Sequence, residues 1–328
     1  MPLLTAQTLI HNRYQIVRLV GQGGMGAVYE AFDQRLRIPV ALKQLLLNEP
    51  QIAAAFAREA HLLAGLRHSA LPRMIDHFEY ANEHFLVMEF IPGDDLATLL
   101  AQRGHAFPVQ QVLNWGDQLL DVVEYLHQRQ PPLLHRDIKP QNLKLSDSGA
   151  LMLLDFGLAK GLQAASGVTT APSLIAYTPQ YAPLEQIQGA SADPRSDLFA
   201  IGATLYHLMT GTPPIDALTR AAALIANQSD PLPASRTLNS QIPLHVDAAL
   251  TQALALAPDH RPASAAAMRQ ALTLAITPAT GATIVIKKPA ESTAVTAQIP
   301  STPSKQRKFL PIWLDLGILA LVGALFAI

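Results

Sequence analysis

The chain has 328 residues, and its 24 Lys and Arg nearly balance its 25 Asp and Glu, which leaves a formal net charge of -1. That length can bury a large core and corresponds to about two domains or one two-lobed unit, while the charge balance gives no indication of a nucleic-acid-binding surface. Cysteine is absent, which excludes disulfide frameworks, thiolate catalysis and thiolate-bound zinc.

The first 90 residues predict a small β-rich unit. Residues 1–13 have neither the basic start nor the sustained apolar run of a signal peptide, and we expect them to form an N-terminal extension. Apolar patterning then predicts several regular elements. In chain order they are a strand over 14–20, a second strand after the glycines of 21–33, a third over 39–45, a helix over 52–66 and a strand over 84–90.

The next part of the chain is predicted to be mainly helical. Between 108 and 127 the apolar residues recur at helical spacing, and Pro131 and Pro132 follow as helix breakers. The segment 195–211 is apolar on nearly every side, which predicts a helix buried all round that ends at Gly211. Helical patterns return near 245–256 and 263–276.

The C-terminal part has a different composition. Residues 275–308 are rich in Pro, Thr, Ser and Ala, which predicts a flexible linker. Residues 309–328 are long and apolar enough for a transmembrane helix, and Lys305, Arg307 and Lys308 precede them as cytoplasmic anchors would. We therefore expect a single-pass protein of the cell membrane with its folded part in the cytoplasm, and the apolar run marks either a tail anchor or a truncated sequence. Asp315 within the segment favours the alternative, a buried or partner-binding helix.

A glycine-rich run, GQGGMGAV, lies between the first two predicted strands. Gly21, Gly23 and Gly26 would let backbone amides close over phosphate oxygens that a side chain would hold away. A dinucleotide-binding site would need a helix to begin at these glycines, whereas residues 27–29 continue as a strand. The alternative is a glycine-rich hairpin without a ligand.

The runs HRDIKPQN at 135–142 and DFG at 155–157 carry the chemistry. Asp137 can receive a hydroxyl proton, and Lys139 beside it can neutralise phosphate charge. Asn142 and Asp155 offer the hard oxygen ligands that magnesium prefers. These residue types in this order predict phosphoryl transfer, where positioning and charge neutralisation supply most of the catalysis.

These motifs resemble those of the eukaryotic-like, bacterial-type serine/threonine protein kinases over roughly residues 14–272. The resemblance implies an α+β, two-lobed protein kinase fold over 14–274, with an N-lobe to residue 90 and a C-lobe from residue 91. It also implies ATP as phosphate donor, Mg²⁺ as the metal with Mn²⁺ as a substitute, and protein substrates. Lys139 would steady the γ-phosphate and goes with Ser/Thr acceptors. Lys43 of the VALK run would hold the α and β phosphates if Glu59 pairs with it; an ordinary helix-surface salt bridge is the alternative for Glu59.

The resemblance also assigns a nucleotide site. Glu89 and Ile91 would offer backbone groups to adenine, with Met88 as gatekeeper and Asp95 near the ribose. Lys144 departs from the family pattern, since an apolar residue usually forms the adenine floor there; only its stem would serve as the floor, with the ammonium in water. The complete set is Val20, Gly21, Gln22, Gly23, Gly24, Met25, Gly26, Val28, Ala41, Lys43, Glu89, Ile91, Asp95 and Lys144.

YTPQYAPLEQ at 177–186 is similar to the end of a kinase activation loop, although Tyr177 and Leu184 depart from the family pattern. Thr178 would then face the catalytic loop, and Glu185 would pair with Arg261. Asp197 would open the buried helix, where it would brace the catalytic loop, act as an ordinary N-cap, or do both.

Arg136 before Asp137 marks a catalytic loop that is often held active by an activation-loop phosphate. Thr169 and Thr170 are the best acceptors, which leads to the hypothesis of autophosphorylation in trans through a transient homodimer. A mobile polar loop is the alternative. A catalytically silent nucleotide-binding scaffold remains the alternative to an active enzyme, while small-molecule phosphotransfer is disfavoured by the HRDIKPQN loop.

Overall fold

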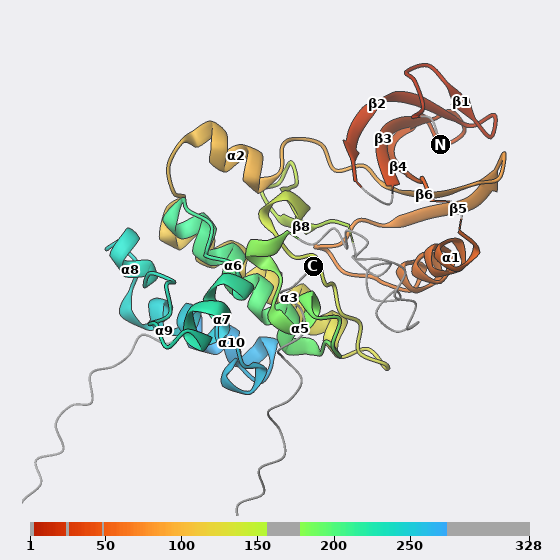
Figure 1. Ribbon diagram of the computed structural model, residues 1–328. Coiled ribbons are helices and arrows are strands. Elements are labelled where there is room, and N and C mark those ends of the chain that lie inside the picture. The colour runs from red at the N-terminus through yellow and green to blue at the C-terminus, as the bar shows by residue number, and fades with distance from the viewer. Residues whose placement is uncertain (1–2, 24–25, 48, 156–177, 274–328) are drawn as a thin grey trace, which may run out of the picture. The chain divides into compact units, whose positions relative to one another are not determined.

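The computed structural model describes residues 3–23, 26–47, 49–155 and 178–273, and the side chains of residues 51, 55 and 59 lie outside the description. These residues form a curled sheet with one helix against it and a second, mainly helical lobe (Figure 1). The predicted linker over 275–308 and the predicted membrane span over 309–328 lie outside the described residues. Within the described ranges, no helix is both long and apolar enough to span a bilayer.

The N-terminal lobe is built on a six-stranded antiparallel sheet in the order β1-β2-β3-β4-β6-β5. Its elements are β1 Leu9–Ile10, β2 Tyr14–Gln22, β3 Gly26–Asp33, β4 Ile38–Leu45, α1 Pro50–Ala64, β5 Met74–Tyr80 and β6 Glu83–Glu89. The four predicted strands and the helix are confirmed. The sheet also takes in β1 from the predicted extension, where Ile10 pairs with Tyr14.

The strand register sorts the side chains of this sheet onto two faces. Val28 pairs with Lys43, and Ala41 pairs with Met88, so these four residues share one face. Residues that alternate with these along the strands, such as Tyr29 next to Val28, lie on the opposite face and are buried in the core of the lobe. One face of the sheet therefore packs in the core of the lobe, and the face with Val28, Ala41, Lys43 and Met88 is available for a binding site.

The second lobe is mainly helical. Its elements are α2 Leu96–Arg103, α3 Val109–His127, β7 Leu143–Leu145, β8 Leu151–Leu153, α5 Leu184–Ile187, α6 Pro194–Thr210, α7 Ala217–Ile225, α8 Ser235–Leu238, α9 Leu244–Ala253 and α10 Ala265–Thr273, with single 3-10 turns at Pro140–Asn142, Pro179–Tyr181 and Pro258–His260. The predicted helices at α3, α6, α9 and α10 are confirmed.

Helix α6 forms the centre of this lobe and is buried along nearly its whole length, as its all-round apolar sequence predicts. Asp193 caps its N-terminus by accepting a hydrogen bond from the Arg195 amide at 2.8 Å. Gly211 ends it in a left-handed conformation with φ 74°. The alternative role of Asp197 as an ordinary N-cap is wrong, since Asp193 is the N-cap and Asp197 lies within the first turn of the helix.

Candidate active site

The short hairpin of β7 and β8 brings the two candidate metal ligands to one place. Leu143 pairs with Leu153 in antiparallel register, so the residue before β7 and those after β8 lie at the same end of the hairpin. The amide of Leu154 donates to the Asn142 carbonyl at 2.8 Å and fixes this arrangement. Asn142 and Asp155 are therefore neighbours although 13 positions separate them in the sequence.

The catalytic loop holds the Asp137 carboxylate between two donors. The Lys139 ammonium lies 3.2 Å from Oδ2 of Asp137, and the Asn142 side-chain amide donates to the same oxygen at 3.0 Å and to the Asp137 carbonyl at 2.7 Å. Lys139 also donates to the Thr178 hydroxyl at 3.1 Å, which confirms that Thr178 faces this loop. The cluster thus joins a fixed carboxylate to a cation of phosphate-binding type.

Asp197 braces this loop from the buried helix α6. Its carboxylate accepts hydrogen bonds from the backbone amides of His135 and Arg136, both at 2.9 Å, and from Nε2 of His127 at 2.9 Å. Burial alone would raise the pKa of Asp197, but the His127 hydrogen bond and the neighbouring charges outweigh it and hold the pKa below its usual value. His127 is a residue that sequence reasoning missed, because its pairing spans 70 positions.

His135 connects the catalytic loop to the segment that carries Asp155. The fully buried ring donates from Nε2 to the Leu154 carbonyl at 3.2 Å, which leaves Nδ1 as an acceptor facing the Asp137 amide at 3.4 Å. Burial lowers the pKa of His135 and keeps the ring neutral, as this tautomer requires.

Two residues of the site have an unusual backbone. Arg136 and Asp155 adopt φ of 63° and 50°, a left-handed conformation that costs non-glycine residues energy and requires support from the surroundings. The amide of Arg136 is held by Asp197, and its carbonyl accepts from Nε2 of Gln186 at 2.8 Å. Gln186 lies in the quoted 177–186 run but carried no predicted role.

Lys43 lies on the free face of the sheet, with its ammonium 3.6 Å from Oδ1 of Asp155. It lines a pocket together with Leu63, Met74 and the predicted gatekeeper Met88. Glu59 is in α1, but its side chain lies outside the described residues, so its pairing with Lys43 remains a prediction.

Strand β2 ends at Gln22 and β3 begins at Gly26, so the described residues on both sides of the glycine-rich run are strands as predicted, and no dinucleotide-type helix begins at Gly26. Gly24 and Met25 lie outside the described residues. A Cβ on Gly26 would come 2.6 Å from the Gln44 carbonyl, so this glycine allows β3 and β4 to approach. Gly21 and Gly23 have open space around the Cβ position, in keeping with room for phosphates beside them.

The remaining nucleotide residues lie along the free sheet face and the segment that follows β6. Val28 and Ala41 are half-buried on that face, while Val20 is exposed. Glu89 ends β6, with Ile91 two residues beyond it. Asp95 caps α2 by accepting from the amides of Ala97 and Thr98, so its contact with a ribose remains a prediction.

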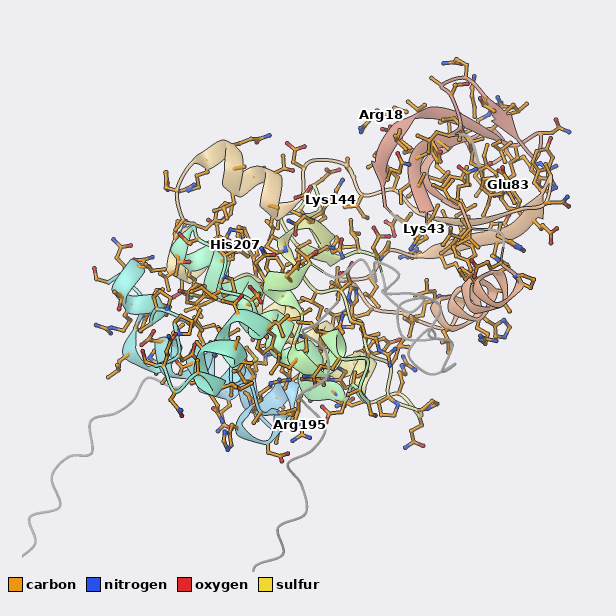
Figure 2. The ribbon with its side chains drawn as sticks, in the orientation of Figure 1. Arg18, Lys43, Glu83, Lys144, Arg195 and His207 are labelled. Atoms are coloured by element: carbon orange, nitrogen blue, oxygen red, sulfur yellow. The ribbon has the colours of Figure 1, made fainter. Side chains whose placement is uncertain are left out.

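The half-buried Lys144 has protein partners for its ammonium that the sequence did not predict. The ammonium donates to the backbone carbonyls of Ile91 at 3.1 Å and Gly93 at 2.7 Å; Lys144 itself is labelled in Figure 2. These contacts are non-local, because the segment after β6 passes beside β7, where Asp95 forms a backbone bridge with Lys144.

The donor set fits a divalent cation held jointly with phosphates. The Asn142 amide nitrogen is engaged by Asp137, so its oxygen remains the ligand, and the Asp155 side chain is 40% exposed. Among the described residues no three His, Asp or Glu side chains gather into a metal cluster of their own. A cation held by Asn142 and Asp155 would take its other ligands from phosphate oxygens and water, as is usual for Mg²⁺.

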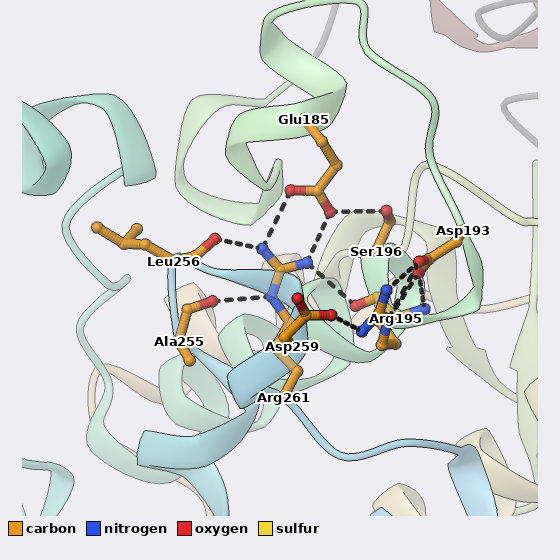
Figure 3. Close-up of polar contacts among 8 residues, drawn as sticks. All are labelled: Glu185, Asp193, Arg195, Ser196, Ala255, Leu256, Asp259 and Arg261. Carbon is orange, nitrogen blue, oxygen red and sulfur yellow. Dashed lines mark hydrogen bonds and ion pairs between the residues drawn. The ribbon is translucent and has the colours of Figure 1, made fainter. Parts of the chain in front are cut away.

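The activation-loop candidates Thr169, Thr170 and Tyr177 lie outside the described residues. At the end of that segment, the predicted pairing of Glu185 with Arg261 is confirmed by two contacts, at 2.6 and 3.1 Å (Figure 3).

Among the described residues, the buried Nε atom of Arg136 has no hydrogen-bond partner.

Comparison with known proteins identifies this arrangement. The sequence model of the protein kinase domain matches residues 14–273, which is most of the chain. The chain belongs to the protein kinase family. Within that family its relatives place the kinase domain in the bacterial, eukaryotic-like serine/threonine branch.

A probable serine/threonine-protein kinase of Streptomyces coelicolor is 33% identical over 79% of this chain and 39% of its own length. PknB of Mycolicibacterium smegmatis is 32% identical over 81% of this chain and 43% of its own. PrkC of Bacillus subtilis is 31% identical over 77% and 39%. The chain therefore spans about two fifths of the length of these relatives.

Solved structures give the same fold. The kinase domain of Mycobacterium tuberculosis PknI matches with a TM-score of 0.64 at 27% identity, covering 82% of this chain and 98% of that one. The apo form of PpkA-294 matches with a TM-score of 0.67 at 26% identity, covering 82% and 99%. The predicted two-lobed protein kinase fold is confirmed for the kinase domain.

Proposed function

We propose that this chain is an ATP-dependent serine/threonine protein kinase that transfers the γ-phosphate of Mg-ATP to hydroxyl groups of proteins in signal transduction. The observation that carries the proposal is the Asp137 carboxylate, held at 3.2 Å from the Lys139 ammonium and 3.0 Å from the Asn142 amide. This fixed carboxylate can orient an incoming hydroxyl and accept its proton.

The other residues divide the remaining work of the transfer. The substrate oxygen bonds to the γ-phosphorus as the bond to ADP breaks, and the proton passes to Asp137. Lys139 neutralises charge on the phosphoryl group in transit, held in place by Thr178. Lys43 holds the phosphates of the donor. Mg²⁺ on Asn142 and Asp155 would neutralise phosphate charge.

Transfer of labelled phosphate from Mg-ATP to a protein substrate tests the proposal. Asp137→Asn should abolish transfer and leave nucleotide binding intact. The same chemical change at Asp147, an exposed residue between β7 and β8, is the control and should leave the rate unchanged. Equal, negligible transfer by all three proteins, with nucleotide still bound, would favour a silent scaffold.

Activation by phosphorylation is the regulatory part of the proposal. Buried Arg136 Nε, without a partner in the described ranges, supports a charge-assisted bond to a phosphate on Thr169 or Thr170. Such autophosphorylation in trans needs a transient homodimer. A Thr169→Ala, Thr170→Ala double variant should lose most activity; a fully active double variant would contradict this step.

Membrane attachment rests on the sequence of residues 309–328 and the basic residues before them. We propose that this segment tethers a cytoplasmic kinase domain to the cell membrane. Fractionation of cells tests it: the full chain should sediment with membranes at low and high salt, and deletion of 309–328 should release it.

A further inference from the structure

Lys144 makes a contact that none of the roles described so far requires. It lies in the middle of β7, and its ammonium donates to the carbonyls of Ile91 and Gly93 at 3.1 and 2.7 Å. The backbone of Lys144 also forms an isolated antiparallel bridge with Asp95. One residue of the C-lobe hairpin thus holds the segment joining β6 to α2 at three points.

The segment that Lys144 holds has little structure of its own. Residues 90–94 belong to neither strand nor helix, and Gly93 has a left-handed φ of 80°. Such a segment samples many conformations unless contacts outside it select one. Two hydrogen bonds from a cation are among the stronger contacts available for this selection.

The electrostatic surroundings of Lys144 suit an ammonium that is held rather than free. Burial lowers the pKa of Lys144, and so does the nearby charge of Arg18. The carboxylates of Asp95, Asp94 and Glu30 act in the opposite direction and favour the charged form. The acids before α2 and in β3 therefore offset part of this lowering, although burial keeps the pKa of Lys144 below its ordinary value.

We propose that Lys144 is a nucleotide-positioning residue, whose ammonium fixes the Ile91–Gly93 segment in the conformation that receives the adenine base. This inference rests on the proposed function, because Ile91 is the residue whose backbone is expected to meet the base. The alkyl stem lies under the base, and the ammonium works through the segment and not on the phosphates. The lysine thus holds the Ile91–Gly93 segment in one conformation before the nucleotide binds.

The alternative, that Lys144 is only an imperfect apolar floor, predicts the opposite result on substitution. A methionine would keep the length of the stem, remove the charge and improve an apolar floor, so the KM for ATP would fall. If the ammonium positions the segment, the same substitution raises the KM. The sign of the change separates the two roles.

The experiment measures steady-state phosphoryl transfer by the full chain with Mg-ATP as the varied substrate. For Lys144→Met we expect the KM for ATP to rise about tenfold, because one to two hydrogen bonds from a charged donor are lost. The kcat should stay within about twofold of the wild type. Lys144→Arg keeps a cation with several donors and should recover most of this loss. Arg35→Met, on the exposed turn between β3 and β4, is the matched control and should match the wild type.

Two further measurements keep the outcomes distinct. Amide hydrogen exchange of a peptide covering residues 89–95, without nucleotide, should be faster in Lys144→Met than in the wild type. A KM for ATP that is unchanged or lower in Lys144→Met would overturn the inference, as would unchanged exchange. Absence of transfer by the wild type would count against the proposed function alone, and the Kd for Mg-ATP by calorimetry, raised in Lys144→Met, would then decide the role of Lys144.

Discussion

The guanidinium of Arg261 donates two hydrogen bonds to the Glu185 carboxylate, from Nη1 to Oε1 at 2.6 Å and from Nη2 to Oε2 at 3.1 Å. The same guanidinium donates to the carbonyls of Ala255 and Leu256, and Ser196 donates to Oε1 of Glu185 at 2.7 Å (Figure 3). Arg261 is completely buried, so every donor has to be satisfied by protein groups. The pair ties the end of the activation segment to the start of α6 and to the loop before α10.

This ion pair predicts a contribution to acid stability. Burial alone would raise the pKa of Glu185, but the hydrogen bonds from Arg261 and Ser196 outweigh it and keep the pKa below its ordinary value of 4.5. A carboxylate with a depressed folded-state pKa contributes stability that is fully present above the unfolded pKa and is lost as the pH falls through the folded pKa. Urea unfolding of the wild type should therefore lose stability steeply below about pH 4.5.

The Glu185→Gln variant tests this assignment. It should be less stable than the wild type at pH 7 by about 3 kcal/mol, because the buried Arg261 loses its counter-charge, and the difference should shrink as the pH falls. Ser196→Ala removes only one of the hydrogen bonds and should give an intermediate curve. A stability difference that is independent of pH would show that Glu185 is not the titrating group.

Asp197→Asn is predicted to impair both stability and catalysis. The amide oxygen can keep at most the two hydrogen bonds that Oδ2 receives from His127 and His135, and the NH₂ group would then face the donating amide of Arg136. We expect a loss of about 3 kcal/mol in the free energy of unfolding. A fall of about a hundredfold in kcat should accompany it, because Arg136 and Asp137 lose their support.

The matched control for this substitution is Asp193→Asn at the N-terminus of the same helix. Asparagine caps helices about as well as aspartate, so this variant should differ from the wild type by less than about 1 kcal/mol. Urea unfolding and steady-state kinetics on both variants provide the comparison. Equal losses at the two positions would mean that the bracing contacts of Asp197 are not special.

The residues that sequence reasoning located correctly belong to contiguous motifs or to strong patterns. Asp137, Lys139 and Asn142 lie within eight consecutive residues, whose spacing largely determines their geometry. The apolar sequence of α6 can be satisfied only by burial on all sides, so its place in the core could be predicted. Contiguous motifs and strong apolar patterns therefore predicted most of the catalytic residues and the buried helix that supports them.

What sequence reasoning missed depends on distant contacts or weak patterns. The β5 strand, Met74–Tyr80, is an edge strand with polar residues and only half-buried side chains, which gives no clean alternation. Helix α2 has eight residues, too few to establish a helical period. The direction of the Lys144 ammonium and the pairing of His127 with Asp197 depend on segments 51 or more positions away, which no local pattern records.

Thr178→Val is predicted to slow phosphoryl transfer without unfolding the protein. The substitution keeps the shape of the side chain but removes the hydroxyl that accepts from Lys139 at 3.1 Å. A mispositioned Lys139 stabilises the transition state less, so kcat should fall about tenfold, with a small change in the KM for ATP. Thr178→Ser restores the hydroxyl and should recover most of kcat; a serine variant as slow as the valine variant would assign the effect to packing.

Gly202→Ala is predicted to destabilise the helical lobe although alanine favours helices. Gly202 lies inside α6, and a Cβ built on it would come 2.8 Å from Cβ of Ala253 in α9, closer than carbon atoms pack. Because α6 and α9 are both buried at this point, neither can move without disturbing the core. The expected loss is about 1–3 kcal/mol in urea unfolding, the usual cost of an overpacked core.

At Gly65, which ends α1 with an ordinary φ of -86°, a Cβ would lie 3.6 Å from its nearest neighbour, so Gly65→Ala should change stability by less than about 1 kcal/mol. A Gly202→Ala protein as stable as the wild type would mean that α9 can yield at this contact, and the close approach of the two helices would then not be a constraint on this core.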